Sequence, residues 1–252
     1  MILRRLAEAI RVQHWFTVVL EILIVVIGIL IGLQVDNWNE RRKDRAAERG
    51  YLERLLTDTI FNIDQVKVKG RSYFDRAESL SRIVSHIEQG KIGEIAKEDL
   101  TYAFCYWYIP ESIRLQSSTY DEMTATGSLE LLADQNIRQL LQLAWAEHDR
   151  AKDENPKLSA FQIDLAKPLR KFTEWRFDAP LQRIDEDPND VPIRAGCRVD
   201  RSALAADPDI SSILVQLNRS QTILGNLHMN ERQALEKLLS ALEQAVSNGD
   251  QP

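Results

Sequence analysis

An apolar run from Phe16 to Val35, FTVVLEILIVVIGILIGLQV, limits what this chain can fold into more than any other stretch. A helix needs about 20 mostly apolar residues to cross the roughly 30 Å hydrocarbon core of a bilayer. Glu21 and Gln34 are the only strongly polar residues in the run. The run therefore predicts a single transmembrane helix over residues 16–35.

Two other interpretations of the run agree less well with its surroundings. A cleaved signal peptide has an apolar core of about 7–15 residues, followed by a cleavage site of small residues. Here Gln34 and Val35 lead directly into Asp36 and Asn37. The second alternative is a buried core helix, which we favour less because residues 22–33 are apolar on all sides apart from two glycines. We therefore expect an uncleaved anchor in the lipid bilayer.

The flanks of the run carry the residues expected at membrane interfaces. Trp15 and Trp38 bracket it, and along a helix they are separated by about 34 Å at about 1.5 Å per residue. Both indoles are thus predicted interface anchors. Residues 1–15 form a basic amphipathic segment, which we expect to lie on the membrane surface.

Basic residues on both sides of the span leave its orientation open. Three arginines precede it, and five Lys/Arg follow within residues 41–49. Read literally, the positive-inside rule places the larger cluster and the soluble domain in the cytoplasm. The second cluster is interleaved with acidic residues, a pattern typical of a solvated helix face with i,i+4 pairing. We therefore expect the amino terminus inside and the soluble domain outside the cytoplasm.

Two features inside the span have alternative interpretations. Gly28 and Gly32 form a G-x-x-x-G motif, which allows close helix–helix approach and predicts a homo-oligomer; glycine is also simply common in membrane helices. Glu21 is an intramembrane carboxylate, and such a group is costly at the bilayer centre. It could extend to the interface or be buried between helices, or it could form an ion pathway with another membrane protein.

Composition narrows the classes of function. Residues 1–50 hold eight Lys/Arg and six Asp/Glu, whereas the remaining chain holds 24 and 32. An acidic soluble part argues against nucleic-acid binding. The sequence has no H-E-x-x-H, G-x-S-x-G, P-loop or C-x-x-C motif, and we predict no enzyme activity, catalytic residue, cofactor or metal site. Cys105 and Cys197 could form one bridge or remain two buried thiols.

The soluble part is predicted to be all-α. Apolar residues at steps of three and four indicate a long juxtamembrane helix over residues 36–90, serving either as a stalk or as the first helix of a bundle. Residues 91–248 are expected to form a helical domain that contains a loop at about 178–200. Residues 249–252 form a tail.

Two stretches of this domain are distinctive. A short helix, Leu100–Ile109, capped by Asp99, holds Tyr102, Tyr106 and Tyr108, which could line a ligand pocket or belong to the core. Further on, the spacing of Thr119 and Glu122 predicts a capping box, and Gly127 is expected to end that helix in a left-handed conformation. Asp134 is expected to cap the next helix, and Pro156 to end it.

Residues of the span and of this stretch resemble an uncharacterised family of bacterial single-pass membrane proteins. The first signature is Glu21 followed by VIGI (26–29), LQ (33–34) and NWNE (37–40), and the second is TYDE (119–122) followed by TGSL (126–129). Together they cover roughly residues 16–145. The resemblance implies an N-terminal anchor in the bacterial inner membrane and a helical domain, but no catalytic residues.

The expected function is interaction: a membrane-anchored scaffold or accessory protein. One alternative is an envelope sensor or adaptor that binds a ligand near residues 102–108. The other is a subunit of an ion-driven membrane complex that uses Glu21.

Overall fold

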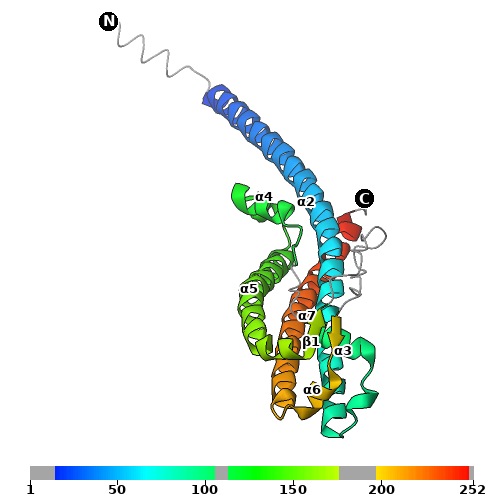
Figure 1. The fold of residues 1–252 in the computed structure, drawn as a ribbon. Helices are drawn as coiled ribbons and strands as arrows, with labels where there is room; N and C mark the ends of the chain where they lie inside the picture. The colour runs from blue at the N-terminus through cyan, green and yellow to red at the C-terminus, as the bar shows by residue number, and fades with distance from the viewer. Residues whose placement is uncertain (1–14, 106–112, 176–196, 250–252) are drawn as a thin grey trace, which may run out of the picture. The chain divides into compact units, whose positions relative to one another are not determined.

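The sequence contains no proline between Trp15 and Glu88, so no residue there lacks the amide hydrogen that a helix requires. In the computed structural model these residues form one α-helix, α2 (Trp15–Glu88), which confirms the predicted continuation of the helix beyond Val35. Gly90 follows its end with a φ of 70°. The structure describes residues 15–105, 113–175 and 197–249 (Figure 1).

The chain divides into two units, Met1–Leu52 and Glu53–Pro252, and the boundary lies within α2. In the first unit, the large apolar side chains from Val19 to Val35 are between 45% and 60% exposed. By length and composition this helix could cross a membrane. A segment that exposes apolar side chains on every side suits lipid better than water.

Three arginines of the basic cluster, Arg41, Arg42 and Arg45, do not form the predicted i,i+4 ion pairs within the described part of the chain. Among the described residues, no carboxylate forms an ion pair with Arg41, Arg42 or Arg45. The reason is the spacing, because Arg41 and Arg45 stand four residues apart and so do Glu40 and Asp44. Neighbours at this separation on a helix are therefore of like charge.

The second unit is a helical bundle, which confirms the predicted fold class. After α2 its elements are η1 (Ile92–Glu94), α3 (Lys97–Cys105), α4 (Ser118–Thr126), η2 (Ser128–Leu131), α5 (Gln135–Ala166), η3 (Lys167–Phe172), β1 (Thr173–Trp175), β2 (Cys197–Val199), α6 (Arg201–Ala206) and α7 (Ile210–Gly249). The small antiparallel sheet, with Trp175 opposite Cys197, was not predicted.

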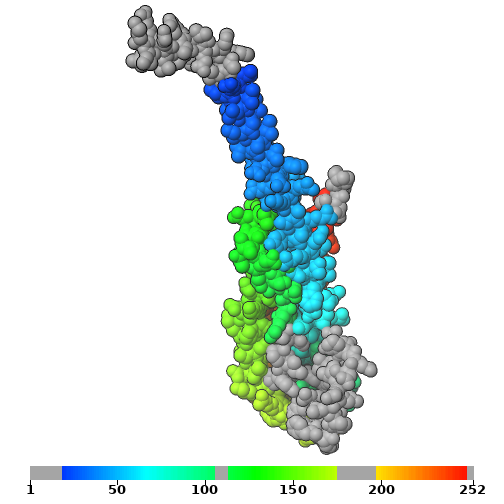
Figure 2. Space-filling view, turned by 90° about the horizontal axis from the view of Figure 1, so that it is seen from above, coloured from blue at the N-terminus to red at the C-terminus, as the bar shows by residue number. Residues whose placement is uncertain are grey.

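Two long helices and α2 account for most of the bundle. α5 and α7 pack along one another. In the space-filling view α4 and α5 lie beside the part of α2 that belongs to the second unit (Figure 2). Asn218 on α7 donates a hydrogen bond to the carbonyl oxygen of Ala77 on α2, which joins these two helices directly.

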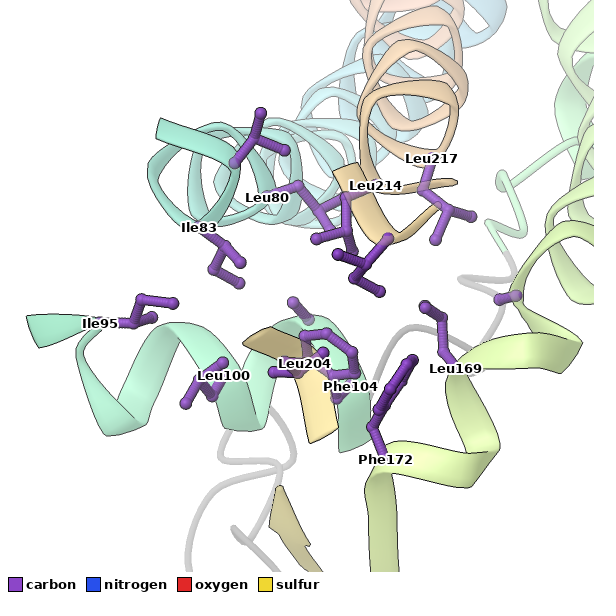
Figure 3. Close-up of a cluster of buried hydrophobic side chains, with 14 residues drawn as sticks. Leu80, Ile83, Ile95, Leu100, Phe104, Leu169, Phe172, Leu204, Leu214 and Leu217 are labelled. Atoms are coloured by element: carbon purple, nitrogen blue, oxygen red, sulfur yellow. The ribbon is translucent and has the colours of Figure 1, made fainter. Parts of the chain in front are cut away.

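The hydrophobic core lies where α2, α3, η3, α6 and α7 meet (Figure 3). Its largest fully buried side chains include Ile83, Phe104, Leu169, Leu204 and Leu214. Beside this cluster, the guanidinium of Arg82 on α2 donates to both carboxylate oxygens of Asp99 on α3, at 2.9 and 2.6 Å. The hydrogen bonds from Arg82 hold the pKa of Asp99 below its ordinary value.

Helix α7 approaches α2 closely at two glycines. A Cβ atom at Gly225 would lie 2.8 Å from the ring of Phe74, and one at Gly70 would lie 3.2 Å from Cβ of His228. Real Cβ contacts are essentially never below 3.0 Å. Glycine at position 225 therefore sets the separation of these helices.

Two predicted helix boundaries were wrong. α3 begins at Lys97, so Asp99 lies within the helix, where its carboxylate binds Arg82 instead of capping. α5 continues through Pro156 to Ala166, because α5 contacts α7 on both sides of the proline and this packing outweighs its cost of about 3 kcal/mol. The predicted left-handed Gly127 and the Asp134 cap are confirmed.

Some predictions concern residues outside the described part of the chain. These are residues 1–14 of the predicted surface segment, positions 178–196 of the predicted loop and the tail from position 250. The last part of that predicted loop, Cys197–Val199, is strand β2.

Candidate functional site

The predicted membrane residues lie on the first unit of the structure. A Cβ atom added to Gly28 or Gly32 would meet nothing within 4 Å, so both glycines leave an open strip on α2. Glu21 is exposed on the same helix. The indole of Trp38 is 60% exposed. Trp15 is the first residue of α2, and its side chain lies outside the described part.

Of the aromatic residues predicted to line a pocket, only Tyr102 is described; Tyr106 and Tyr108 lie outside the described residues. Tyr102 is half-buried, and its hydroxyl donates to the carbonyl oxygen of Ser72 on α2 at 3.3 Å. The guanidinium carbon of Arg76 lies 5.8 Å from the centre of its ring. Tyr102 thus joins α3 to α2.

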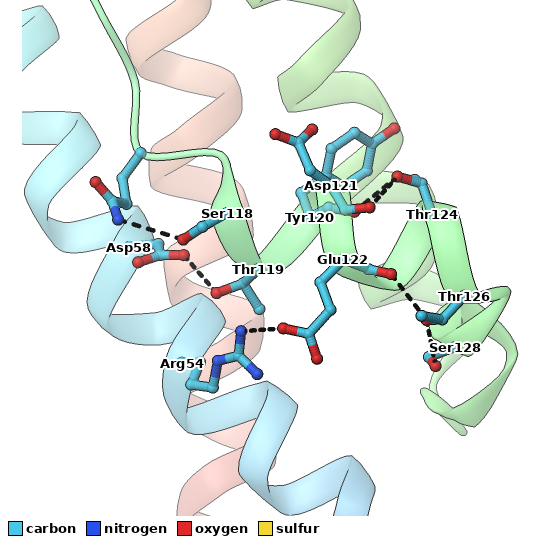
Figure 4. Close-up of polar contacts among 11 residues, drawn as sticks. Arg54, Asp58, Ser118, Thr119, Tyr120, Asp121, Glu122, Thr124, Thr126 and Ser128 are labelled. Carbon is cyan, nitrogen blue, oxygen red and sulfur yellow. Dashed lines mark hydrogen bonds and ion pairs between the residues drawn. The ribbon is translucent and has the colours of Figure 1, made fainter.

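The TYDE stretch holds α4 against α2 (Figure 4). The hydroxyl of Thr119 donates to a carboxylate oxygen of Asp58 at 2.6 Å, and the carboxylate of Glu122 forms an ion pair with Arg54. The predicted capping box is therefore wrong. Both side chains have partners on α2, and the residue at the N-cap of α4 is Ser117, not Thr119.

Two further contacts fix the same region. Asn62 on α2 binds the backbone of Gln116 in both directions: its amide nitrogen donates to the carbonyl oxygen at 3.0 Å and its oxygen accepts from the amide at 2.7 Å. On the other side of α4, the ring of Tyr120 stacks on Trp145 of α5 with centroids 4.9 Å apart. The stretch before and within α4 is thus attached to α2 and α5.

A row of buried and half-buried polar side chains joins α5 to α7, and it was not predicted from the sequence. On α5 the row consists of His148, Asn155 and Gln162, which are spaced by seven residues. Each meets a polar partner on α7: Glu231 for His148, His228 for Asn155, and Ser220 with Gln221 for Gln162. We call this set the polar seam.

Glu231 is the centre of the polar seam and has no exposed surface. Its two carboxylate oxygens lie 2.6 Å from Nδ1 of His148 and 2.9 Å from Nδ1 of His228. A carboxylate only accepts hydrogen bonds, so both imidazoles carry their proton on Nδ1. The other nitrogen of His228 lies 3.3 Å from the amide nitrogen of Asn155.

The electrostatics of Glu231 follow from this geometry. Burial acts to raise its pKa, but the hydrogen bonds and charge of His148 and His228 outweigh burial and lower the pKa below the ordinary value. Tyr73 on α2 stacks on His228 with ring centroids 5.5 Å apart. The carboxylate is therefore stabilised in its charged form inside the bundle.

The polar side chains of the seam bind one another across α5 and α7, which indicates a role in helix packing and not in ligand binding. Both imidazoles direct Nδ1 at Glu231, so these nitrogens are occupied. Within the described ranges no group of three His, Cys, Asp or Glu residues is placed to hold a metal ion. The seven-residue spacing of polar residues on α5 is the sequence signal that could have revealed the seam, since polar residues in a heptad position set helix register.

The two cysteines form a disulfide bond. Cys105 is the last residue of α3 and Cys197 the first of β2, and their Cα atoms are 6.2 Å apart. The structure thus selects the bridged alternative over two free thiols. The bond attaches the small sheet to the hydrophobic core.

Comparison with known proteins places no further constraint on this chain. No family model matches it, and no match was found among curated proteins or among solved structures. The fold defines the class: a mostly helical protein with one long apolar N-terminal helix and a helical bundle.

Proposed function

We propose that this chain is a single-pass protein of the bacterial inner membrane, with its bundle in the periplasm, and that it acts as an interaction partner, either a scaffold or an accessory subunit. Residues 16–35 span the bilayer in this proposal, and Gly28 and Gly32 mediate self-association. Membership of the bacterial single-pass family suggested by the sequence signatures belongs to the same proposal.

The disulfide supports the orientation. Disulfide bonds form and persist in oxidising compartments such as the bacterial periplasm, and they are rare in the cytosol. Cys105 and Cys197 lie in the second unit of the chain. A periplasmic bundle would allow this bond to form and persist.

One exposed apolar surface supports the proposed interaction role. On the part of α2 within the second unit, Ile60, Phe61 and Val68 are 53%, 49% and 45% exposed. At 100° per residue they share one side of the helix. Apolar side chains gathered on one exposed face are typical of a protein contact. This face is the single observation that favours binding of another protein over a purely internal role.

Site-specific photocrosslinking in cells tests the proposal. A photoreactive residue at Phe61 should give a discrete adduct, and the same residue at Asp153, exposed on α5, should not. An adduct of twice the chain's mass would identify a second copy, and another mass a different partner. Equal diffuse labelling at both positions would contradict an interaction role for this face.

A further inference from the structure

The helix face that follows the apolar segment has a distinctive charge pattern. Trp38, Arg41, Arg42 and Arg45 follow the spacing i, i+3, i+4 and i+7, so they share one side of α2. All four are exposed. Nε of Arg45 donates to the carbonyl oxygen of Arg41 at 3.2 Å, as expected of residues one turn apart. We call these four residues the arginine face.

Acidic residues occupy a different side of the same turns. At 100° per residue, Asp36, Glu40 and Asp44 lie between about 110° and 170° from the centre of the arginine face. Lys43 lies on their side as well. The carboxylates of Asp36, Glu40 and Asp44 are thus separated from the arginine face around the helix.

The arginine face has unfavourable electrostatics by itself. Arg41 and Arg45 are like charges at i,i+4, an arrangement that destabilises a helix. Across the described ranges no ion pair joins Arg41, Arg42 or Arg45 to a carboxylate. An external anion would reduce this repulsion. It would approach from the side of the arginine face, because Asp36, Glu40 and Asp44 lie on the other side of the helix.

We propose that the arginine face binds the phosphate groups of anionic phospholipids. This inference rests on the proposed membrane span. Guanidinium groups bind phosphate oxygens in pairs, and an indole is favoured at headgroup level. Arg41 is about 9 Å beyond Val35 at about 1.5 Å per residue. Side chains on a helix point toward its N-terminus, so the arginines reach back toward the apolar segment.

Native mass spectrometry of the full-length chain in detergent tests the inference, with phosphatidylglycerol and phosphatidylcholine added in equal amounts. The wild-type chain should retain phosphatidylglycerol preferentially. Arg41→Gln and Arg45→Gln should each weaken that binding about fivefold, the effect expected of one basic residue near an anionic surface. Glutamine retains a high helix propensity, so α2 should be preserved.

Lys43→Gln is the matched control, because it removes one positive charge from the same turn but from the other side of the helix. It should leave phosphatidylglycerol binding unchanged. An equal loss in Lys43→Gln would overturn the inference, and so would equal retention of both lipids. Release of the lipid by millimolar inorganic phosphate would indicate a site for soluble anions and would also overturn it.

A second measurement separates this inference from the proposed function. The full-length chain is reconstituted with vesicles of phosphatidylcholine alone and floated on a density gradient after carbonate treatment. A chain that fails to float has no membrane anchor, and both proposals fail. A chain that floats but shows no preference for phosphatidylglycerol retains the anchor and loses only the lipid site.

Discussion

Glu231 is a carboxylate without exposed surface, and two imidazoles keep it charged. Its pKa is lowered in the folded chain. A group with a lowered folded pKa stabilises the fold above its unfolded pKa, about 4.3 for glutamate, and loses that contribution as the pH falls through the folded value. The polar seam should therefore weaken in acid.

Glu231→Gln should lower the free energy of unfolding at neutral pH by about 2–4 kcal/mol, since one imidazole would then face an amide donor inside the bundle. The difference from wild type should shrink as the pH falls below about 4. Urea unfolding of both chains in detergent between pH 7 and pH 3 measures it. A difference that stays constant over this range would show that the carboxylate charge is not what stabilises the seam.

Gly225→Ala tests the close approach of α7 to α2. The added methyl would lie 2.8 Å from the ring of Phe74, and such overpacking costs about 1–3 kcal/mol, partly offset by the better helix propensity of alanine. We expect Tm to fall by a few degrees in thermal unfolding followed by circular dichroism. Gly50→Ala is the control, because nothing lies within 4 Å of its Cβ; its Tm should be unchanged or higher. A Tm for Gly225→Ala that matches the control would contradict the packing account.

At the scale of elements, the attachment of α4 to α2 is the contact that sequence reasoning misassigned. Thr119→Val and Asp58→Ala form a double-mutant cycle across the hydrogen bond that joins them. We expect a coupling free energy of about 1 kcal/mol in urea unfolding. Thr124→Val is the control, because its hydroxyl donates only to backbone oxygens of its own helix. Zero coupling would show that this hydrogen bond does not hold α4 against α2.

Local chemistry made some elements predictable. Gly127 adopts the left-handed conformation and Asp134 caps α5 through the amide of Asn136, since both depend only on neighbours in sequence. The partners of Thr119 lie on α2, 61 residues away, and short-range spacing contains no information about them. The same holds for Pro156, which the contacts of α5 with α7 retain within the helix.

The sequence predicts features that depend on neighbouring residues better than contacts between distant residues, and this holds for the candidate sites as well. The long apolar helix could be identified, because its apolar residues form a continuous local pattern, and the roles of Gly28, Gly32 and Glu21 within it stay predictions. The seven-residue spacing on α5 indicates where the polar seam runs on that helix, but it does not identify the partners on α7, because His148 and Glu231 are 83 residues apart. The pairing of Cys105 with Cys197 likewise depends on a 92-residue separation that only the fold closes.

The whole molecule combines two features. Its apolar N-terminal segment suits lipid, and its disulfide-bonded bundle suits an oxidising compartment. The proposed function accommodates both features with a single crossing and a bundle outside the cytoplasm. The arginine face and the apolar residues on α2 are then the surfaces available to lipid and to protein partners. These roles depend on the orientation more than on any other property.

Topology is therefore the most direct measurement. A reporter that is active only outside the cytoplasm is fused after Pro252, and a fluorescent reporter that is active only inside is fused in a parallel chain. The account predicts activity of the first and silence of the second. Fluorescence of the second with an inactive first reporter would place the bundle in the cytoplasm and contradict the account.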